Sequence, residues 1–436
     1  MVDLVADSVP APQSIADGWS WPRLLAFRFL FIYLVLYLPP NVSWVFPWLG
    51  WIATGYDAVA HPVVVWVAER LFHVQRPITV FNGDDSTYNY LLVLVIGISA
   101  AIGCGAWSIA GRRRRSHPRL HDGLRLAVRY CLAASMLNYG FAKVIGIQFP
   151  SPLLDRLLEP YGQGSPMGLL WTFMGHSKGY NIFTGSVEVI GAMLLFWERT
   201  TLCGTLLLTS ALTNVVVLNL AYDVPIKLYS IHLLLFTVYL MLPDVRRLWA
   251  FLLWDRYVPR RVFHEPWRSL WGRRVSVSMK AAVICTTLVV IVRQDLEIVR
   301  SIYGPIARRY GIYEVDSFVE NGELRPPQFG DETRWRRVII NQDGRLSVQT
   351  MDDAVVQWRT TERVPERTFE LSGTRYPRDP TRRAVLRYTE PEPGRLTLEG
   401  TYDGRSIDAH LRKTPLPSFV LLNRGFHWIN EYHYNR

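Results

Sequence analysis

Long runs of apolar residues dominate the first 300 positions of the chain. An α-helix needs about 17–25 mostly apolar residues to cross a bilayer, and six runs approach or reach that length. They cover residues 24–38 with their flanks, 90–110, 124–146, 179–197, 202–221 and 228–242. A seventh run, 275–292, is interrupted by Lys280 near one end. We therefore predict a membrane all-α bundle of about seven transmembrane helices.

The pattern changes at about residue 299, where the apolar runs become short and turn residues separate them. Runs 335–341 and 345–350 flank Gln342-Asp343-Gly344, which is typical of a β-hairpin. Runs 384–388, 395–399 and 406–411 follow, with Asp403-Gly404 as a second turn. This spacing predicts a small antiparallel β sandwich or barrel. A closed barrel can hold an apolar ligand, and the alternative is a fully packed interior.

Four regions follow from these patterns. Residues 1–20 form a polar N-terminal segment, and 21–245 form the main transmembrane bundle. Residues 246–298 combine a basic, aromatic surface segment with the last transmembrane helix, and 299–436 form the β domain.

Charge indicates the orientation of the bundle. The formal net charge is +11, but the arginines concentrate in two loops between apolar runs, at 112–119 and 246–274. This positive-inside pattern places both loops in the cytoplasm, and it argues against nucleic acid as a partner. We expect a multi-pass protein of the bacterial inner membrane with a cytoplasmic N-terminus and a periplasmic, extracytoplasmic β domain. Arg28 and Arg129 lie near inner helix ends, where we expect their side chains to extend toward water.

Three connecting segments have compositions of their own. Residues 41–89 are aromatic and apolar, which favours a short helix on the outer surface, with a re-entrant segment as the alternative. Residues 148–178 contain repeated Pro and Gly, which exclude a continuous helix, although Leu153, Leu154, Leu157 and Leu158 fit one or two amphipathic turns. Residues 244–274 mix tryptophan with arginine, as in a helix on an anionic membrane surface or in a solvated loop with aromatic anchors.

Known cofactor motifs do not appear in the sequence. The four cysteines lie in apolar runs and form no C-x-x-C pair, so a disulfide framework is not expected. No haem, flavin, iron–sulfur or metal motif, P-loop or dinucleotide fingerprint is visible. The cofactor is therefore unknown from motifs, and whether the protein is an enzyme stays open.

Ionisable residues inside the apolar runs give the strongest indication of a site. Only five of the 48 basic Lys and Arg residues are lysines, and Lys143 and Lys227 lie in or beside apolar runs. Ionisable groups at such depth usually face a bundle interior or a water-filled cavity. We predict that polar residues of four helices converge beneath the outer membrane face. The candidate catalytic residues are Lys143, Glu188 and His232, and the candidate ligand-binding residues are Tyr139, Asn181, Thr184, Asn214, Asn219, Asp223 and Lys227.

Two interpretations of this cluster stay open. In the first, a desolvated lysine acts as a general base beside hydrogen-bond donors. In the second, the same groups form an ion-pair network that fixes helix register. Asp223 and Lys227 also fit solvated loop residues, and His232 also fits a hydrogen-bonded core histidine.

Several sequence segments resemble the DoxX-like family of bacterial membrane proteins over roughly residues 24–245. The segments are Asn138-Tyr-Gly-Phe-Ala-Lys-Val144, Gln148-Phe-Pro150, residues 165–175, Phe183-Thr-Gly-Ser-Val-Glu188, Leu218-Asn219 and Tyr222-Asp-Val-Pro-Ile-Lys227. The tail Arg424-Gly-Phe-His-Trp-Ile-Asn-Glu431 resembles an extension found in a subset of that family.

More distantly, the bundle resembles that of vitamin K-dependent gamma-carboxylase, in which a tyrosine and a lysine on one helix serve a quinol. Tyr139 and Lys143 lie closer together than that pair. The resemblance implies a quinone-linked role in a membrane redox process.

Three functions remain as hypotheses. The first is a membrane protein whose polar site binds a quinone or another membrane lipid. The second is a non-enzymatic scaffold or accessory subunit that anchors the β domain in a larger membrane complex. The third, transport, ranks last because the chain shows no clear inverted repeat.

Overall fold

The computed structural model describes residues 18–45, 49–74, 85–258, 269–302, 309–342, 344–376, 379–416 and 419–431. The chain divides into two units. One comprises residues 1–141 and 183–291 and is called the helical unit below, and the other comprises residues 142–182 and 292–436 and is called the barrel unit. Most of the predicted segment 1–20 lies outside the described residues.

All seven predicted spans are helical. The helices are α1 (Trp21–Val45), α3 (Thr87–Ala110), α4 (Pro118–Ile145), α7 (Lys178–Leu195), α8 (Thr201–Ala221), α9 (Lys227–Met241) and α11 (Leu270–Ile302). Five segments of the described chain are long and apolar enough to cross a membrane: 21–40, 87–110, 201–221, 227–252 and 270–300. The structure therefore supports membrane association, while seven crossings stay a prediction.

Glycines allow close helix packing in the helical unit. A Cβ atom on Gly140 of α4 would lie 2.7 Å from Val189 Cγ2 and 2.9 Å from the Gly185 carbonyl of α7. A Cβ on Gly204 of α8 would lie 2.8 Å from the Gly191 carbonyl. Small residues let helix backbones approach where lipid supplies no hydrophobic drive for association, so α4, α7 and α8 pack with little intervening side chain.

Arg28 corrects one prediction about the inner helix ends. Its side chain is fully buried, where we expected it to reach water. Nη1 donates to Ser108 Oγ at 3.0 Å, and Nη2 donates to the Gly111 and Arg114 carbonyls at 3.2 and 3.3 Å. Because the last carbonyls of a helix lack intrahelical partners, Arg28 of α1 caps the end of α3.

Two of the three connecting segments contain the helices that their composition favours. Helix α2 (Gly50–Leu71) is longer than the short surface helix predicted for residues 41–89, and it contains Pro62. The short 3-10 helix η3 (Leu242–Asp244) leads into α10 (Val245–Leu252). Helix α10 leaves Trp249 and Phe251 exposed, which fits an amphipathic surface helix.

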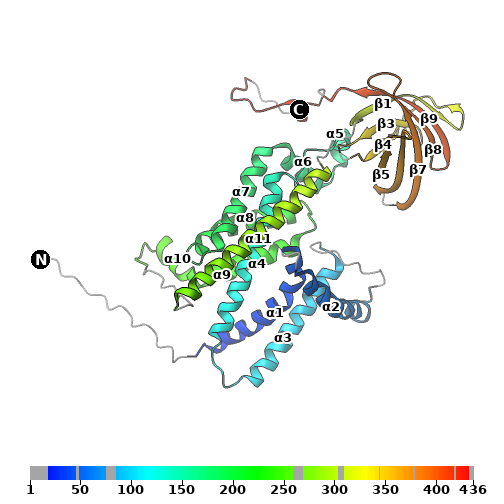
Figure 1. The fold of residues 1–436 in the computed structure, drawn as a ribbon. Coiled ribbons are helices and arrows are strands. Elements are labelled where there is room, and N and C mark those ends of the chain that lie inside the picture. Colours follow the sequence, from blue (N-terminus) through cyan, green and yellow to red (C-terminus); the bar gives the residue numbers. More distant parts are fainter. Residues whose placement is uncertain are drawn as a thin grey trace. The chain divides into compact units, whose positions relative to one another are not determined.

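The β domain is a closed antiparallel barrel (Figure 1). Its strands are β1 (Gly311–Glu320), β2 (Glu323–Leu324), β3 (Trp335–Ile340), β4 (Leu346–Thr350), β5 (Val355–Arg363), β6 (Thr368–Tyr376), β7 (Asp379–Thr389), β8 (Arg395–Tyr402) and β9 (Arg405–Thr414). Neighbours pair in the order β2-β1-β3-β4-β5-β6-β7-β8-β9, and β9 also pairs with β1. Of the two predicted architectures, the barrel is therefore the correct one.

Side chains fill the barrel interior. Trp335 and Trp358 are at most 1% exposed and lie in one cluster with Phe318, Leu386 and Leu398. The Trp358 Nε1 group donates to the Tyr402 hydroxyl at 3.1 Å, which satisfies the indole inside an apolar core. These buried aromatic residues support the packed interior that the sequence left as an alternative.

The connection between α4 and α7 belongs to the barrel unit. It contains α5 (Leu154–Leu158), the 3-10 turn η2 (Tyr161–Gln163) and α6 (Pro166–His176), so its Pro and Gly residues do exclude a continuous helix. Helix α5 packs on the outer barrel wall, where Leu154 contacts a cluster containing Ile312 and Ile339. The Leu154 N–H also donates to Asn341 Oδ1 at 3.1 Å.

Candidate functional site

The candidate residues divide between the two units. Lys143 and Asn181 belong to the barrel unit, and the other candidates belong to the helical unit. The prediction that all of them meet in one cluster therefore stays a prediction.

The barrel unit contains a cavity beside the end of α4 and the start of α7. Its volume is about 280 Å³. Lys143, Lys178 and Asn181 contribute its polar lining, with Phe149 and Ile182 among the apolar residues. Two of the five lysines of the chain therefore lie at one cavity, and the residue that sequence analysis missed is Lys178.

Buried donors shape this cavity. Lys143 is 6% exposed and Asn181 is 3% exposed, and the Asn181 amide donates to the Phe149 carbonyl at 3.3 Å. Gly175 also lines the cavity, and a Cβ on Gly175 would lie 2.2 Å from the Pro150 carbonyl. The absence of a side chain at Gly175 thus allows the end of α6 to close on the 149–151 segment, which lines the cavity.

In the helical unit, His232 of α9 contacts two tyrosines of α1, Tyr33 and Tyr37. Its Nδ1 is 2.7 Å from the Leu228 carbonyl, which can only accept, so this nitrogen carries the proton. Nε2 then accepts from the Tyr33 hydroxyl at 2.7 Å, and the Tyr37 ring stacks on the imidazole with centroids 4.0 Å apart. Both ring nitrogens are hydrogen-bonded, which fits a histidine that joins α1 to α9.

Asn219, Asp223 and Lys227 lie where α8 turns into α9. Asn219 Nδ2 donates to Ser230 Oγ at 3.0 Å. Lys227 Nζ lies 2.8 Å from Asp223 Oδ1 and 3.6 Å from Asp85 Oδ2. The Asp223 side chain is 85% exposed. Asp223 is therefore a solvated loop residue, which is one of the interpretations that the sequence left open.

The remaining candidates of the helical unit differ in burial. Glu188 of α7 is 3% exposed, Thr184 is half-buried, and Asn214 of α8 is exposed. The Tyr139 ring lies 6.2 Å from the ring of Tyr229. Glu188 is therefore a buried charged residue, whereas the side chain of Asn214 is exposed.

Sequence analysis also missed Asp295 of α11. This carboxylate is 3% exposed, and its Oδ2 atom has no hydrogen-bond partner in the described part of the chain. The signal was available, because Asp295 lies at the end of an apolar run in which acidic residues are costly.

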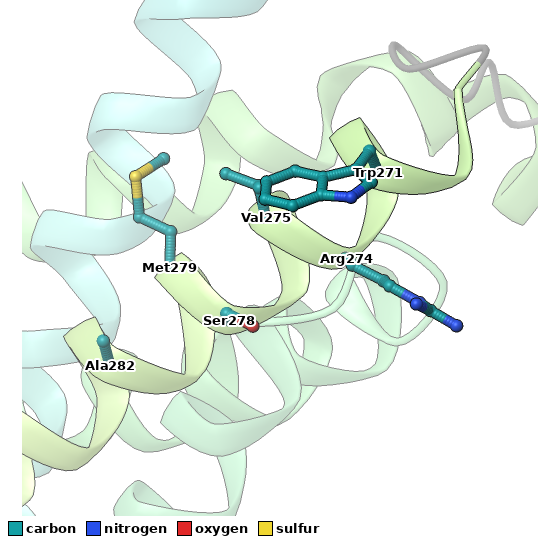
Figure 2. Close-up of a pocket in the computed structure, with 6 residues that line it drawn as sticks. All are labelled: Trp271, Arg274, Val275, Ser278, Met279 and Ala282. Carbon is teal, nitrogen blue, oxygen red and sulfur yellow. The ribbon is translucent and has the colours of Figure 1, made fainter.

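A second hollow lies along one face of α11. Its volume is about 530 Å³, and six residues of that helix line it, from Trp271 to Ala282. Figure 2 shows the Trp271 ring alongside Val275, with the Arg274 guanidinium pointing away from Met279. The lining is mainly apolar and carries no acid–base pair, so this face suits contact with lipid rather than chemistry.

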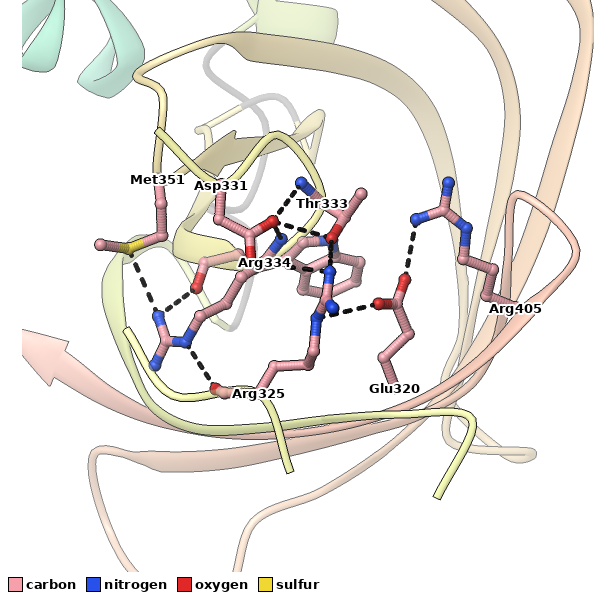
Figure 3. A network of polar contacts seen from close by, with 8 residues as sticks. Glu320, Arg325, Asp331, Thr333, Arg334, Met351 and Arg405 are labelled. Atoms are coloured by element: carbon pink, nitrogen blue, oxygen red, sulfur yellow. Dashed lines mark hydrogen bonds and ion pairs between the residues drawn. The ribbon is translucent and has the colours of Figure 1, made fainter. Parts of the chain in front are cut away.

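The barrel holds a polar network near the strands β1 and β9 (Figure 3). Arg325 Nε lies 3.2 Å from Glu320 Oε2, and Arg405 Nη1 lies 2.8 Å from Glu320 Oε1. Asp331 Oδ1 accepts from the Thr333 N–H and hydroxyl, both at 2.9 Å. These charges are paired with one another, which fits a structural network at a barrel rim.

Arg334 is the buried member of that network. It is 2% exposed, and it donates to the carbonyls of Arg325 and Trp335 at 2.9 and 3.0 Å. It also donates to the Val315 carbonyl at 3.5 Å, where the β1–β9 register shifts. A bulge leaves backbone groups without hydrogen-bond partners on the neighbouring strand. The Arg334 guanidinium supplies a hydrogen bond to the backbone at this irregularity.

Comparisons with known proteins add little to this geometry. No protein-family model and no solved structure match the chain. A segment of 133 residues is 29% identical to "Uncharacterized protein YwoB" of Bacillus subtilis (strain 168), covering 30% of this chain and 84% of that protein. The resemblance to the DoxX-like family therefore stays a prediction.

Proposed function

We propose that this chain is a multi-pass membrane protein that binds a membrane lipid, with the oxygen-bearing head of the lipid in the Lys143 cavity. The observation that carries the proposal is the convergence of Lys143, Lys178 and Asn181 on that cavity. An ammonium group offers three hydrogen-bond donors and an amide offers two. Oxygen atoms of a head group are the acceptors that such a lining recognises.

A quinone is the redox-active candidate. Its two carbonyl oxygens accept hydrogen bonds, and its isoprenoid tail remains in the bilayer. A cavity of about 280 Å³ is near the lower limit for small-molecule sites, so it suits a head group without its tail. The resemblance of the 138–144 segment to quinone-linked membrane proteins points the same way.

Glu188 and His232 have supporting roles in this proposal. Glu188 supplies a buried negative charge within α7 of the helical unit. His232 positions α1 against α9 through Tyr33. Electrons for a bound quinone would come from a partner protein.

The test is the lipid that co-purifies with the protein. Lys143→Met keeps the length of the side chain and removes its donors, and losing a charge-assisted hydrogen bond costs about 1.5–3 kcal/mol. We expect the content of bound quinone, or of another specific lipid, to fall about tenfold or more. Mass spectrometry of lipids extracted from equal amounts of protein measures this change.

Lys280→Met is the matched control, because Lys280 lies on an exposed face of the apolar helix α11. It should retain the lipid. Equal lipid content in the two variants, with both eluting as folded protein, would contradict the proposal.

A scaffold is the second candidate function. The observation that favours it is the docking of α5 on the barrel wall, which ties the connection between two helices to the barrel. If Lys143→Met leaves lipid content unchanged while removal of the barrel abolishes capture of a partner protein, the scaffold function replaces lipid binding.

A further inference from the structure

The segment that follows the barrel exposes large apolar side chains. Phe426, Trp428 and Ile429 are 78%, 90% and 77% exposed. The short helix α12 (Val420–Asn423) precedes them and leaves Val420 51% exposed. Scattered apolar residues are common on surfaces, but several large exposed ones within ten residues are typical of an interaction site.

Polar contacts inside this segment hold its shape. Arg424 Nη2 donates to Asn430 Oδ1 at 2.8 Å, and Asn430 Nδ2 donates to the His427 carbonyl at 3.3 Å. The rings of Phe426 and Trp428 meet edge to face with centroids 4.9 Å apart. The polar groups thus bind one another, while the apolar groups remain on the outside.

The place where this segment leaves the barrel indicates which surface its apolar side chains contact. Leu416 and Phe419 pack against the cluster of Leu154, Ile312 and Ile339. Leu154 lies nine residues after the end of α4, and Ile312 lies ten residues after the end of α11. Two connections to apolar helices therefore reach the same patch of barrel wall at which the segment begins.

Strand pairing supports this placement. Thr414 at the end of β9 pairs with Ile312 at the start of β1, so the chain leaves the barrel beside the point where it enters from α11. Ile312 follows the end of α11 by only ten residues, and α11 is long and apolar enough to cross a membrane, so a short stretch of chain links this end of the barrel to a candidate span. Trp428 lies 14 residues after Thr414, and an extended chain of that length spans at most about 50 Å.

We propose that residues 420–430 form an interfacial anchor, which inserts Phe426, Trp428 and Ile429 among the lipid head groups of the membrane crossed by α11. Tryptophan is enriched at this depth because its ring is amphipathic. An exposed apolar face with a basic residue, here Arg424, binds the surface of a bilayer. The inference rests on the membrane placement in the proposed function, and it assigns the lipid surface as the partner of this segment.

The test places a nitroxide label at residue 429 of the full chain in lipid nanodiscs. Ile429→Cys is made in a background where Cys104, Cys131, Cys203 and Cys285 are replaced by alanine, and it leaves Phe426 and Trp428 intact. Oxygen concentrates in the bilayer and a nickel chelate stays in water. We expect the ratio of oxygen to nickel accessibility at residue 429 to exceed one.

Phe329→Cys is the matched control, because Phe329 is 90% exposed and lies beyond the β2 end of β1. Its label should show a ratio below one. Adding Phe426→Ser and Trp428→Ser to the Ile429→Cys protein should lower the ratio to the control value, and both positions are exposed enough to change without unfolding the barrel.

Two results at residue 429 overturn the proposal. One is a label that lies in water. The other is a label shielded from both reagents, which would indicate contact with a second copy or another protein. Ile102→Cys, on an exposed position of α3, reports membrane placement separately. If residue 102 is also aqueous, the membrane placement itself has failed, whereas a lipid-exposed 102 with an aqueous 429 refutes the anchor alone.

Discussion

At the scale of single residues, Asp155 is a carboxyl group buried under α5. It is 6% exposed, and Gln357 and Ser347 of the barrel wall donate to its Oδ2 atom. Burial raises the pKa of Asp155, and the charges of Arg345 and Arg156 offset only part of that rise. The folded protein therefore binds this proton more tightly than the unfolded chain does.

The direction of the pH effect follows from that difference. Stability falls with rising pH wherever the folded state holds more protons, so Asp155 weakens the fold as pH rises from the unfolded pKa through the folded pKa. Asp155→Asn should raise the unfolding temperature at pH 7 by removing this cost. Each unit of raised pKa corresponds to about 1.4 kcal/mol, and the gain should disappear near pH 4. Thermal unfolding between pH 4 and pH 8 measures it.

Asp379 provides the opposite control. Its carboxylate is exposed, and hydrogen bonds from Thr381 lower its pKa. Asp379→Asn should therefore bring no gain at neutral pH. A stability gain of Asp155→Asn that is the same at pH 4 and pH 7 would refute the argument from burial.

Buried charged residues could be predicted from the sequence where apolar residues surround them along the chain. Lys143 and Glu188 stand out in apolar runs, and both are buried. The partners of His232 were not predictable, because Tyr33 lies 199 positions away and tyrosine is common in apolar helices. Lys178 was missed because it begins a helix after a loop, where lysine is ordinarily solvated.

At the scale of elements, Asp85 caps α9 from a distant part of the chain. Its two carboxylate oxygens accept from the backbone N–H groups of Lys227 and Leu228 at 2.8 and 2.9 Å. The first N–H groups of a helix lack intrahelical acceptors. Asp85 therefore ties the start of α9 to the residues that lead into α3.

Replacement of this cap should destabilise the helical unit. Loss of a capping side chain costs about 0.5–2 kcal/mol, so Asp85→Ala should lower the unfolding temperature measurably in detergent. Asp223→Asn is the comparison, since Asp223 contacts the same lysine through an exposed ion pair, and such pairs contribute at most about 1 kcal/mol; asparagine also tolerates the positive φ of 51° at this position. Shifts of equal size in the two variants would rule out capping as the main role of Asp85.

Helices were predictable as elements, whereas several strands were not. The seven apolar runs locate seven helices of the described chain, because their length separates them from loops, whereas α2 (Gly50–Leu71) was expected only as a short helix. Strands β1, β2, β5 and β6 were missed, and in β5 only Trp358 is fully buried between half-buried and exposed residues. In the sequence of a small barrel, a strand is recognised only by the alternation of apolar, inward-facing residues with polar, outward-facing ones. This alternation is weak when polar residues are numerous.

At the scale of the whole molecule, the contact between α5 and the barrel wall makes the α4–α7 connection part of the barrel unit. Leu154 is 1% exposed there, and its N–H is bound to Asn341. Replacing a buried leucine by alanine costs about 2–5 kcal/mol. Leu154→Ala combined with Asn341→Ala should therefore release α5 from the wall.

Hydrogen exchange measures that release. Peptides that cover residues 148–163 should exchange faster in the double variant, while peptides from β7 and β8 keep their protection. Leu157→Ala, at the partly buried edge of the same cluster, should have a smaller effect. Unchanged protection of residue 154 in the double variant would show that α5 does not depend on this contact.

The closure of the sheet by β9 against β1 determines when the β domain can complete its fold. These strands lie about 90 residues apart, and their long pairing joins residues 312–320 to 407–414. During synthesis β1 emerges first, and one of its sides has no permanent neighbour until β9 has been made about 90 residues later. In that interval the open side can pair with strands of other chains, so we expect chaperones to matter most for this protein while the ring of strands is incomplete.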